Sequence, residues 1–282
     1  MKLTTSASES NVGGGCEIEV PSIDKKKTIL IAHRGYSGIA PENTLASFRE
    51  AAAQENFGAI ECDVYRTTDG VYVLQHDGNL KRIFGLDMLI YECSYDQIKS
   101  LFAIGGNNPG NYFIEDRRVC LLEQYMQILK ETDKRAVIEL KQAYSQDITD
   151  ELFDMITSYG INDRMDIISF SFAALDNICK AMDTYTERYP GRVLKRPDIY
   201  LLTMDPEIAN DGIGGKTPVD WALDRGYNLS IKHNKINADL VNKIHEAGKK
   251  VSVWTVNNYE KACHYIFDLG VDCLTSNHLL FP

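Results

Sequence analysis

The chain has 282 residues, of which 44% are hydrophobic and 25% are charged, a balance typical of a globular protein. Its formal net charge of -10 argues against nucleic acid as a partner and against stable attachment to an anionic membrane, because both need a basic surface. No apolar run approaches the roughly 20 residues that a transmembrane helix requires.

Residues 1–27 are rich in serine, threonine and glycine, show no periodicity, and are expected to form a flexible tail. The seven cysteines are odd in number and include no CxxC pair, so neither a disulfide framework nor a zinc knuckle is expected. We therefore predict a reducing, cytoplasmic location. Export or lipid anchoring after removal of a leader is the alternative, since Gly13–Cys16 resembles a lipoprotein cleavage site, although no hydrophobic stretch precedes it.

From residue 28 onward, short β-branched runs alternate with helical patterns. Eight main strands are predicted at Thr28–Ala32, Ala59–Tyr65, Ala136–Lys141, Ile167–Phe170, Ile199–Thr203, Leu229–Lys232, Val251–Thr255 and Val271–Thr275, with Val71–Gln75 as an extra piece. Helices are predicted at Asn43–Asn56, Leu121–Glu131, Ile148–Tyr159 and Ala173–Tyr185, and others begin near Pro218, Ala238 and Tyr259.

This repeat of βα units predicts an α/β fold, a closed (β/α)8 TIM barrel of parallel strands that forms one catalytic domain over residues 28–282. Only Asn277–Pro282 follow the last strand, so a full eighth helix is expected to be missing or to be supplied by another segment. Residues 78–118 are too long for an ordinary connection, and we expect them to form an insertion that shapes the pocket.

Chemically active side chains cluster at the predicted strand ends, where a barrel builds its active site. Glu61 and Asp63 share one face of the second strand, and Cys62 faces away. Glu139 and Lys141 share a face of the third main strand by the same alternation. Three carboxylates at one rim repel one another unless a cation lies between them, so we predict a site for Mg²⁺ or Ca²⁺, which prefer oxygen ligands.

His33 and His76 follow strands and precede turn glycines, so they are candidates for an acid–base pair. Arg34 is a candidate clamp for an anion, and Asp77 either orients a histidine or the loop, or caps a turn. The remaining histidines are expected to be structural: His233, His245, His264 and His278. Asp211–Gly215 matches no complete phosphate-binding fingerprint and is predicted to be a flexible loop.

Several motifs in a fixed order carry a resemblance to a known family. They are His33-Arg34-Gly35, Pro41-Glu42-Asn43-Thr44, Glu61-x-Asp63, His76-Asp77, Ile138-Glu139-Leu140-Lys141, Ser169-Phe170 and Val253-Trp254-Thr255-Val256-Asn257. With this order and spacing, residues 29–280 resemble the glycerophosphodiester phosphodiesterase family. The resemblance implies a TIM barrel with a small insertion after the second strand, and hydrolysis of a small-molecule glycerophosphodiester to glycerol 3-phosphate and an alcohol.

The resemblance also implies roles for individual residues. Glu61, Asp63 and Glu139 would bind the divalent cation, and His33 and His76 would form the acid–base pair. Arg34 and Lys141 would hold the phosphate, and Trp254 would line the pocket against the glycerol moiety. Glu42 and Asn43 would support these groups. The attacking group would be either the glycerol 2-hydroxyl, through a cyclic phosphate, or water.

Two departures from the family pattern bear on the head group rather than on the reaction. Lys81–Gly85 replaces a threonine-rich stretch, and Cys120–Glu123 replaces a Pro-Thr-Leu-Glu pattern. A related phospholipase, phosphatidylinositol-specific or sphingomyelinase D-like, is the main alternative, because the insertion carries apolar residues at 84–91. A catalytically silent binding protein on the same fold is a second alternative. A zinc amidohydrolase is disfavoured because the first strand ends in His-Arg-Gly rather than His-x-His.

Overall fold

The computed structural model describes residues 27–281, so the expectation of a flexible tail falls, except for its last residue, outside the described residues. The strands in this range are β1 (Ile29–Ala32), β2 (Ala59–Arg66), β3 (Tyr72–Leu74), β4 (Cys120–Leu121), β5 (Arg135–Leu140), β6 (Met165–Ser169), β7 (Asp198–Thr203), β8 (Asn228–Lys232), β9 (Val251–Trp254) and β10 (Cys273–Ser276). Eight of them are parallel and follow the order β1, β10, β9, β8, β7, β6, β5, β2. Pairing of Ile31 with Ala59 closes the circle between β1 and β2, which confirms the predicted barrel.

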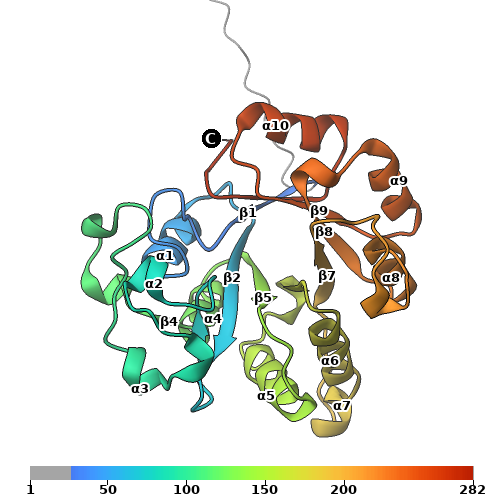
Figure 1. Cartoon of the computed structure of the whole chain (residues 1–282). Coiled ribbons are helices and arrows are strands. Elements are labelled where there is room, and N and C mark those ends of the chain that lie inside the picture. Colours follow the sequence, from blue (N-terminus) through green and yellow to red (C-terminus); the bar gives the residue numbers. More distant parts are fainter. Residues whose placement is uncertain (1–26, 282) are drawn as a thin grey trace, which may run out of the picture.

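Helices surround this barrel (Figure 1). They are α1 (Leu45–Ala53), α2 (Lys81–Phe84), α3 (Tyr95–Ile98), α4 (Leu122–Lys130), α5 (Gln146–Thr157), α6 (Phe172–Asp183), α7 (Tyr185–Arg188), α8 (Pro218–Asp224), α9 (Ala238–Glu246) and α10 (Tyr259–Cys263). Short 3₁₀ helices lie at Ile90–Glu92, Pro109–Asn111, Ile114–Arg117, Asn162–Arg164, Asp211–Ile213 and His233–Lys235, and a π-helical turn covers His264–Asp268. Within the described residues no helix follows β10, as the sequence pattern indicated.

Side chains alternate between the two faces of each strand, so the barrel has one apolar layer outside its wall and another inside it. Cys62 lies in the large apolar layer between the barrel and its helices, whereas Glu61 and Asp63 point the other way, as predicted. Every residue of β2 except Arg66 is buried, which is typical of a parallel strand covered on both faces. A second, smaller layer inside the barrel includes Ile31, Val137 and Ile168.

The extra strand predicted after β2 is β3, which pairs antiparallel with β2 and lies outside the closed circle. The segment 78–118, which we call the insertion, packs Ile83, Phe84 and Ile90 into a small apolar core that it shares with Tyr65 of β2 and Val73 of β3. Side chains of the insertion also bond to the β1–α1 loop: the Asn107 amide donates to the carbonyl of Ser37 at 2.6 Å. The insertion is therefore fastened next to the loop that carries His33 and Arg34.

The β1–α1 loop requires a glycine at one position. Gly35 has a φ of +76°, and a Cβ added there would meet the backbone carbon of Ser47 at 2.6 Å. Ser47 is held in the first turn of α1, where Thr44 caps the helix through a reciprocal capping box. The loop and α1 therefore pack backbone against backbone at this point.

We expect Gly35→Ala to lower the free energy of unfolding by about 3 kcal/mol or more, since backbone strain and overpacking add. Gly248→Ala is the matched control, because Gly248 has a φ of +69° with nothing within 4 Å of an added Cβ. The control isolates the cost of the left-handed backbone, about 1 kcal/mol. Urea unfolding of both variants measures the difference, and equal losses would contradict the argument.

Candidate active site

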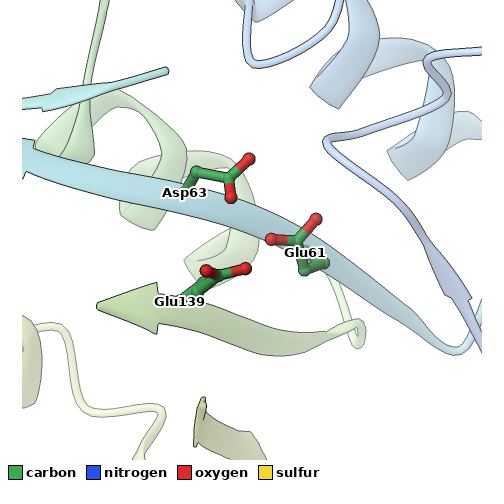
Figure 2. Close-up of side chains that lie close together, drawn as sticks. All are labelled: Glu61, Asp63 and Glu139. Carbon is green, nitrogen blue, oxygen red and sulfur yellow. The ribbon is translucent and has the colours of Figure 1, made fainter. Parts of the chain in front are cut away.

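Three carboxylates meet at the carboxyl ends of β2 and β5. Glu61 and Asp63 come from β2, and Glu139 comes from β5, where it is in register with Asp63. One oxygen of each lies within 4.8 Å of the others, and all three side chains are buried (Figure 2). The structure thus brings together the three residues that the sequence predicted as metal ligands.

Crowding of the three acids shifts their protonation. Burial, with the charges of Asp63 and Glu139, raises the pKa of Glu61 well above its ordinary value. Burial and the charge of Asp63 likewise raise the pKa of Glu139 to about 7. Burial also raises the pKa of Asp63, but Lys141 and Arg34 outweigh it and hold that pKa below the usual range. Fully ionised, the three acids would therefore carry more negative charge than Lys141 and Arg34 neutralise, and without a cation Glu61 and Glu139 hold protons to a higher pH than free carboxyl groups do.

A divalent cation fits this cluster. Oxygen Oε1 of Glu61 is buried without a hydrogen-bond partner, while Oε2 accepts the backbone N–H of Arg34 at 2.8 Å. An unpartnered buried carboxylate oxygen is costly unless a group outside the chain satisfies it. Because all the ligand atoms are oxygens, the site suits a hard ion such as Mg²⁺ or Ca²⁺.

Lys141 lies beside the carboxylates. Its ammonium donates to Glu139 at 2.8 Å and to Asp63 at 3.2 Å. These two carboxylates raise the pKa of Lys141 although burial lowers it, so the side chain stays charged. In this arrangement Lys141 neutralises two acids directly, and Arg34 is the cation that lines the pocket.

His33 follows β1 and is oriented by Asn277, which follows β10. Its Nδ1 lies 2.6 Å from Oδ1 of Asn277, which also accepts a hydrogen bond from the hydroxyl of Ser37. An Nδ1–H donated to Asn277 leaves Nε2 of the ring for the pocket. Burial, and then the charge of Arg34, lowers the pKa of His33 to about 4, so the ring is neutral near pH 7.

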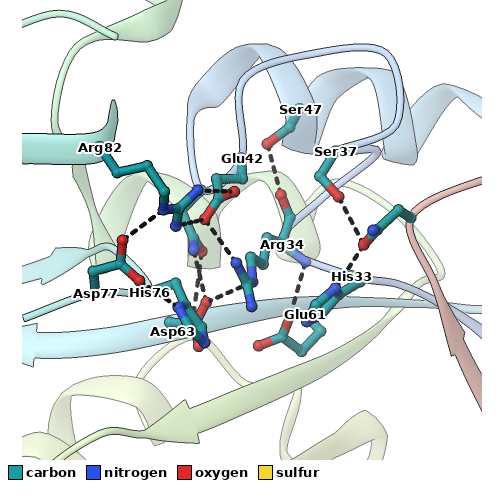
Figure 3. Close-up of polar contacts among 12 residues, drawn as sticks. His33, Arg34, Ser37, Glu42, Ser47, Glu61, Asp63, His76, Asp77 and Arg82 are labelled. Carbon is teal, nitrogen blue, oxygen red and sulfur yellow. Dashed lines mark hydrogen bonds and ion pairs between the residues drawn. The ribbon is translucent and has the colours of Figure 1, made fainter. Parts of the chain in front are cut away.

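His76 follows β3 and is oriented by its neighbour. Its Nδ1 lies 2.8 Å from Oδ1 of Asp77, whose other oxygen accepts a hydrogen bond from Arg82 at 2.6 Å (Figure 3). Burial lowers the pKa of His76, although the charge of Asp63 opposes this shift. Of the two roles predicted for Asp77, the geometry matches the orientation of a histidine.

Arg34 occupies a left-handed conformation, with a φ of +56°. Its guanidinium donates to Glu42 at 2.8 Å and lies 3.5 Å from Asp63. Its Nε is buried without a hydrogen-bond partner. Asn43 supports Asp63, to which its amide donates at 2.7 Å. Glu42 and Asn43 therefore contact the groups that they were expected to support.

Six of the predicted site residues line one cavity of about 140 Å³, whereas Asp63 and Lys141 contact residues that line it without lining it themselves. His33, Arg34, Glu61, His76 and Glu139 line its polar half. Its other half is largely apolar and includes Ile168, Phe170, Leu202, Met204 and Trp254. The indole N–H of Trp254 donates to the carbonyl of Ser230 at 3.1 Å, and its ring packs edge-to-face against Phe170.

Sequence reasoning missed several residues of this cavity. Phe170 and Met204 directly follow β6 and β7, and the rule that barrel strand ends carry the site would have found them. Asn277 and Arg82 carry no comparable signal, because their contacts depend on how distant segments pack. A larger open groove of about 680 Å³ includes part of Asp211–Gly215, but it contains none of the predicted catalytic residues.

Other expectations concern residues outside the cavity. His233, His245 and His264 each bond to a neighbouring side chain that does not line it. Of the apolar residues at 84–91, Phe84 and Ile90 are buried in the apolar core next to the insertion, while Tyr91 is 43% exposed.

Among the residues described, no helix is long and apolar enough to cross a membrane.

Two known enzymes are similar to this chain in sequence. The chain is 27% identical over 251 residues to a glycerophosphodiester phosphodiesterase of Bacillus altitudinis, which covers 87% of this chain and 92% of the relative. It is 24% identical over 274 residues to mouse glycerophosphodiester phosphodiesterase 1, covering 90% and 80% of the two chains.

The fold also matches solved structures. An Oleispira antarctica phosphodiesterase, solved in complex with the product sn-glycerol-3-phosphate, superposes with a TM-score of 0.68 at 24% identity, covering 91% of this chain and 95% of that one. A glycerophosphodiester phosphodiesterase from Parabacteroides distasonis gives a TM-score of 0.63 at 23% identity, covering 89% and 93%. The sequence profile of the glycerophosphoryl diester phosphodiesterase family matches residues 33–280, and the chain belongs to this family of hydrolases.

Proposed function

We propose that this enzyme hydrolyses small, soluble glycerophosphodiesters to glycerol 3-phosphate and an alcohol, with a divalent cation held by Glu61, Asp63 and Glu139. The observation that carries the proposal is the meeting of two histidines, Arg34 and the Glu61–Asp63–Glu139 cluster, of which Glu61 and Glu139 line the same cavity as the histidines. The product named for the Oleispira phosphodiesterase supports the same choice of substrate.

The residues divide the reaction between them. A phosphodiester is an anion and repels a nucleophile, so Arg34 binds a phosphoryl oxygen and offsets its charge. When bound, the cation supplies further positive charge at the phosphoryl group. One histidine takes the proton of the attacking hydroxyl at Nε2, and the other donates a proton to the leaving alkoxide. Asn277 and Asp77 hold the two rings through Nδ1.

The attacking group is either the substrate's own 2-hydroxyl or water. Attack by the 2-hydroxyl releases a cyclic phosphate before glycerol 3-phosphate, whereas attack by water does not. Phosphorus NMR of a running reaction therefore separates the two routes.

The test of the proposal is an assay of alcohol release from glycerophosphocholine, glycerophosphoethanolamine and glycerophosphoinositol. We expect turnover of at least one substrate with Mg²⁺ or Ca²⁺. In EDTA we expect a loss of about 10²-fold or more, because charge neutralisation by a metal is worth several kcal/mol. Readdition of the ion should restore the rate. Failure to turn over any of the three with any divalent ion would refute the proposal.

A second candidate substrate is a lipid that carries an acyl chain. It is favoured by two large apolar side chains at the cavity that remain exposed, Phe170 at 40% and Met204 at 51%. The same assay with lysophosphatidylcholine, free and in vesicles, tests it. Activity on the vesicles alone would mean that the substrate is the lipid and not a soluble glycerophosphodiester.

A further inference from the structure

Arg82 connects the insertion to two parts of the catalytic cavity. It lies in α2, the first helical turn of the insertion. Its guanidinium donates to both oxygens of Glu42, at 2.7 and 2.8 Å, and to Asp77 at 2.6 Å (Figure 3). All three hydrogen bonds are charge-assisted, which makes them shorter and stronger than neutral ones. One side chain thus holds carboxylates from two distant segments.

Each of these carboxylates contacts a residue that we place at the reacting phosphate. Asp77 accepts from Nδ1 of His76 at 2.8 Å, and Glu42 accepts from Arg34 at 2.8 Å. Arg82 itself does not line the cavity. It can therefore act on the reaction only through Asp77 and Glu42.

The charge of Arg82 also matters for Arg34. Burial raises the pKa of Glu42, but the guanidiniums of Arg82 and Arg34 outweigh it, so Glu42 is ionised. With Arg82 present, Glu42 shares its two oxygens between two cations. Without Arg82, Glu42 would pair with Arg34 alone and compete with the phosphate for it.

The backbone around Arg82 is fixed by close packing within the insertion. A Cβ added at Gly105 would meet the carbonyl oxygen of Arg82 at 2.2 Å, and the N–H of Gly105 donates to Ile83 at 2.9 Å. Gly106 lies against Pro41, next to Glu42, where an added Cβ would come within 3.1 Å of the proline Cα. The insertion thus presents the guanidinium from a fixed position.

We infer that Arg82 is a positioning residue that orients His76 through Asp77 and keeps Arg34 available to phosphate through Glu42. This inference deepens the proposed function and rests on it. It also changes the interpretation of Lys81–Gly85, where the chain departs from the family pattern and where we expected an effect on head-group specificity. Through Arg82, this segment acts on the groups at the phosphate, which every substrate of the enzyme carries.

Kinetics of Arg82→Gln test the inference. We expect kcat to fall and KM to rise, with a loss in kcat/KM of about 10- to 100-fold, the usual effect of removing a partner that orients a reacting group. Arg82→Lys should recover little, because a shorter, differently shaped ammonium cannot reproduce the directions of the three hydrogen bonds that the planar guanidinium makes, two to Glu42 and one to Asp77. Lys81→Gln is the matched control: it removes a charge from the same helix, where Lys81 pairs with Asp87 away from the cavity.

Two further variants separate the two contacts. Asp77→Asn should lower mainly kcat, and Glu42→Gln should change mainly KM. Because Arg82 acts on His76 through Asp77, the double variant Arg82→Gln/Asp77→Asn should show no lower kcat than Asp77→Asn alone. Additive losses in kcat, or a loss that follows a lowered unfolding temperature, would overturn the inference and indicate a merely structural role.

A readout that does not require turnover completes the test. Nitrogen NMR at pH 8 reports which ring nitrogen of His76 carries the proton. We expect the Nδ1–H tautomer in the wild type and a mixture of tautomers in Arg82→Gln. An unchanged tautomer together with unchanged kcat/KM would overturn the inference while leaving the proposed function intact. If the wild type turned over no substrate, the proposed function would fail and the tautomer alone would decide the role of Arg82.

Discussion

Replacing Glu61 with glutamine is expected to remove the metal-dependent activity and, in the absence of metal, to stabilise the protein at neutral pH. Glutamine keeps the shape of the side chain, and its amide oxygen can accept the N–H of Arg34 as Glu61 now does. It removes a buried acid that must either bear a crowded negative charge or hold a proton above its ordinary pKa, and both cost stability without metal. We expect kcat/KM to fall by about 10³-fold, the order of several kcal/mol of lost charge stabilisation.

The effect on stability depends on pH. A raised pKa means that the folded state holds a proton which the unfolded state has already released. That contribution is fully present below the ordinary pKa and is lost as pH rises through the folded pKa. For Glu139 the window runs from its ordinary value of 4.5 to about 7, and Glu61 shifts in the same direction. In EDTA, wild type should therefore lose stability between pH 5 and 8, and Glu61→Gln should lose less.

Calorimetric titration with Mg²⁺ and Ca²⁺, thermal unfolding in EDTA and steady-state kinetics measure the three effects. The control is Glu123→Gln, which removes an exposed carboxylate from α4. If Glu61→Gln bound metal and turned over substrate as the wild type does, the assignment of Glu61 as a ligand would be wrong.

Removing either histidine should have the second largest effect. His33→Ala and His76→Ala should each lower kcat by about 10²–10⁴-fold, the usual contribution of a general acid or base. The leaving group distinguishes their roles. A nitrophenyl ester of glycerol phosphate releases a stable anion that needs no proton. On this substrate the variant that lacks the acid should therefore keep most of the wild-type kcat. The variant that lacks the base should be equally slow on both substrates.

His245→Ala is the matched control, because that histidine bonds Asp272 outside the cavity. Wild-type rates in either single variant would remove that histidine from the mechanism. Equal losses on both substrates for both variants would contradict the division into an acid and a base.

The sequence predicts most of the polar half of the site because two local rules apply there. Alternation places Glu61 and Asp63 on one face, and parallel pairing brings Glu139 to the same rim as Asp63. Neither rule concerns contacts between loops. The bond from Asn277 to His33 and the bonds from Arg82 depend on the packing of segments far apart in the chain, and no periodicity encodes them.

The apolar half was missed for a different reason. Ile168, Leu202 and Met204 are ordinary strand and strand-end residues, and a hydrophobic residue in a barrel strand is usually core. Trp254 was identified only through the family resemblance. The structure adds that Phe170 packs against it, so these two rings form one wall of the cavity.

The contact between His33 and Asn277 makes catalysis depend on completion of the barrel. The three carboxylates, both histidines and Arg34 have all emerged once β5 is made. Asn277, which follows β10, emerges only after all eight strands of the barrel have been made, and it reaches His33 when β10 pairs with β1. A nascent or truncated chain can thus hold every charged group of the site without an oriented His33. Enzymatic activity then reports closure of the barrel. Cation binding would not report it, because the carboxylates come from β2 and β5 and do not depend on β10.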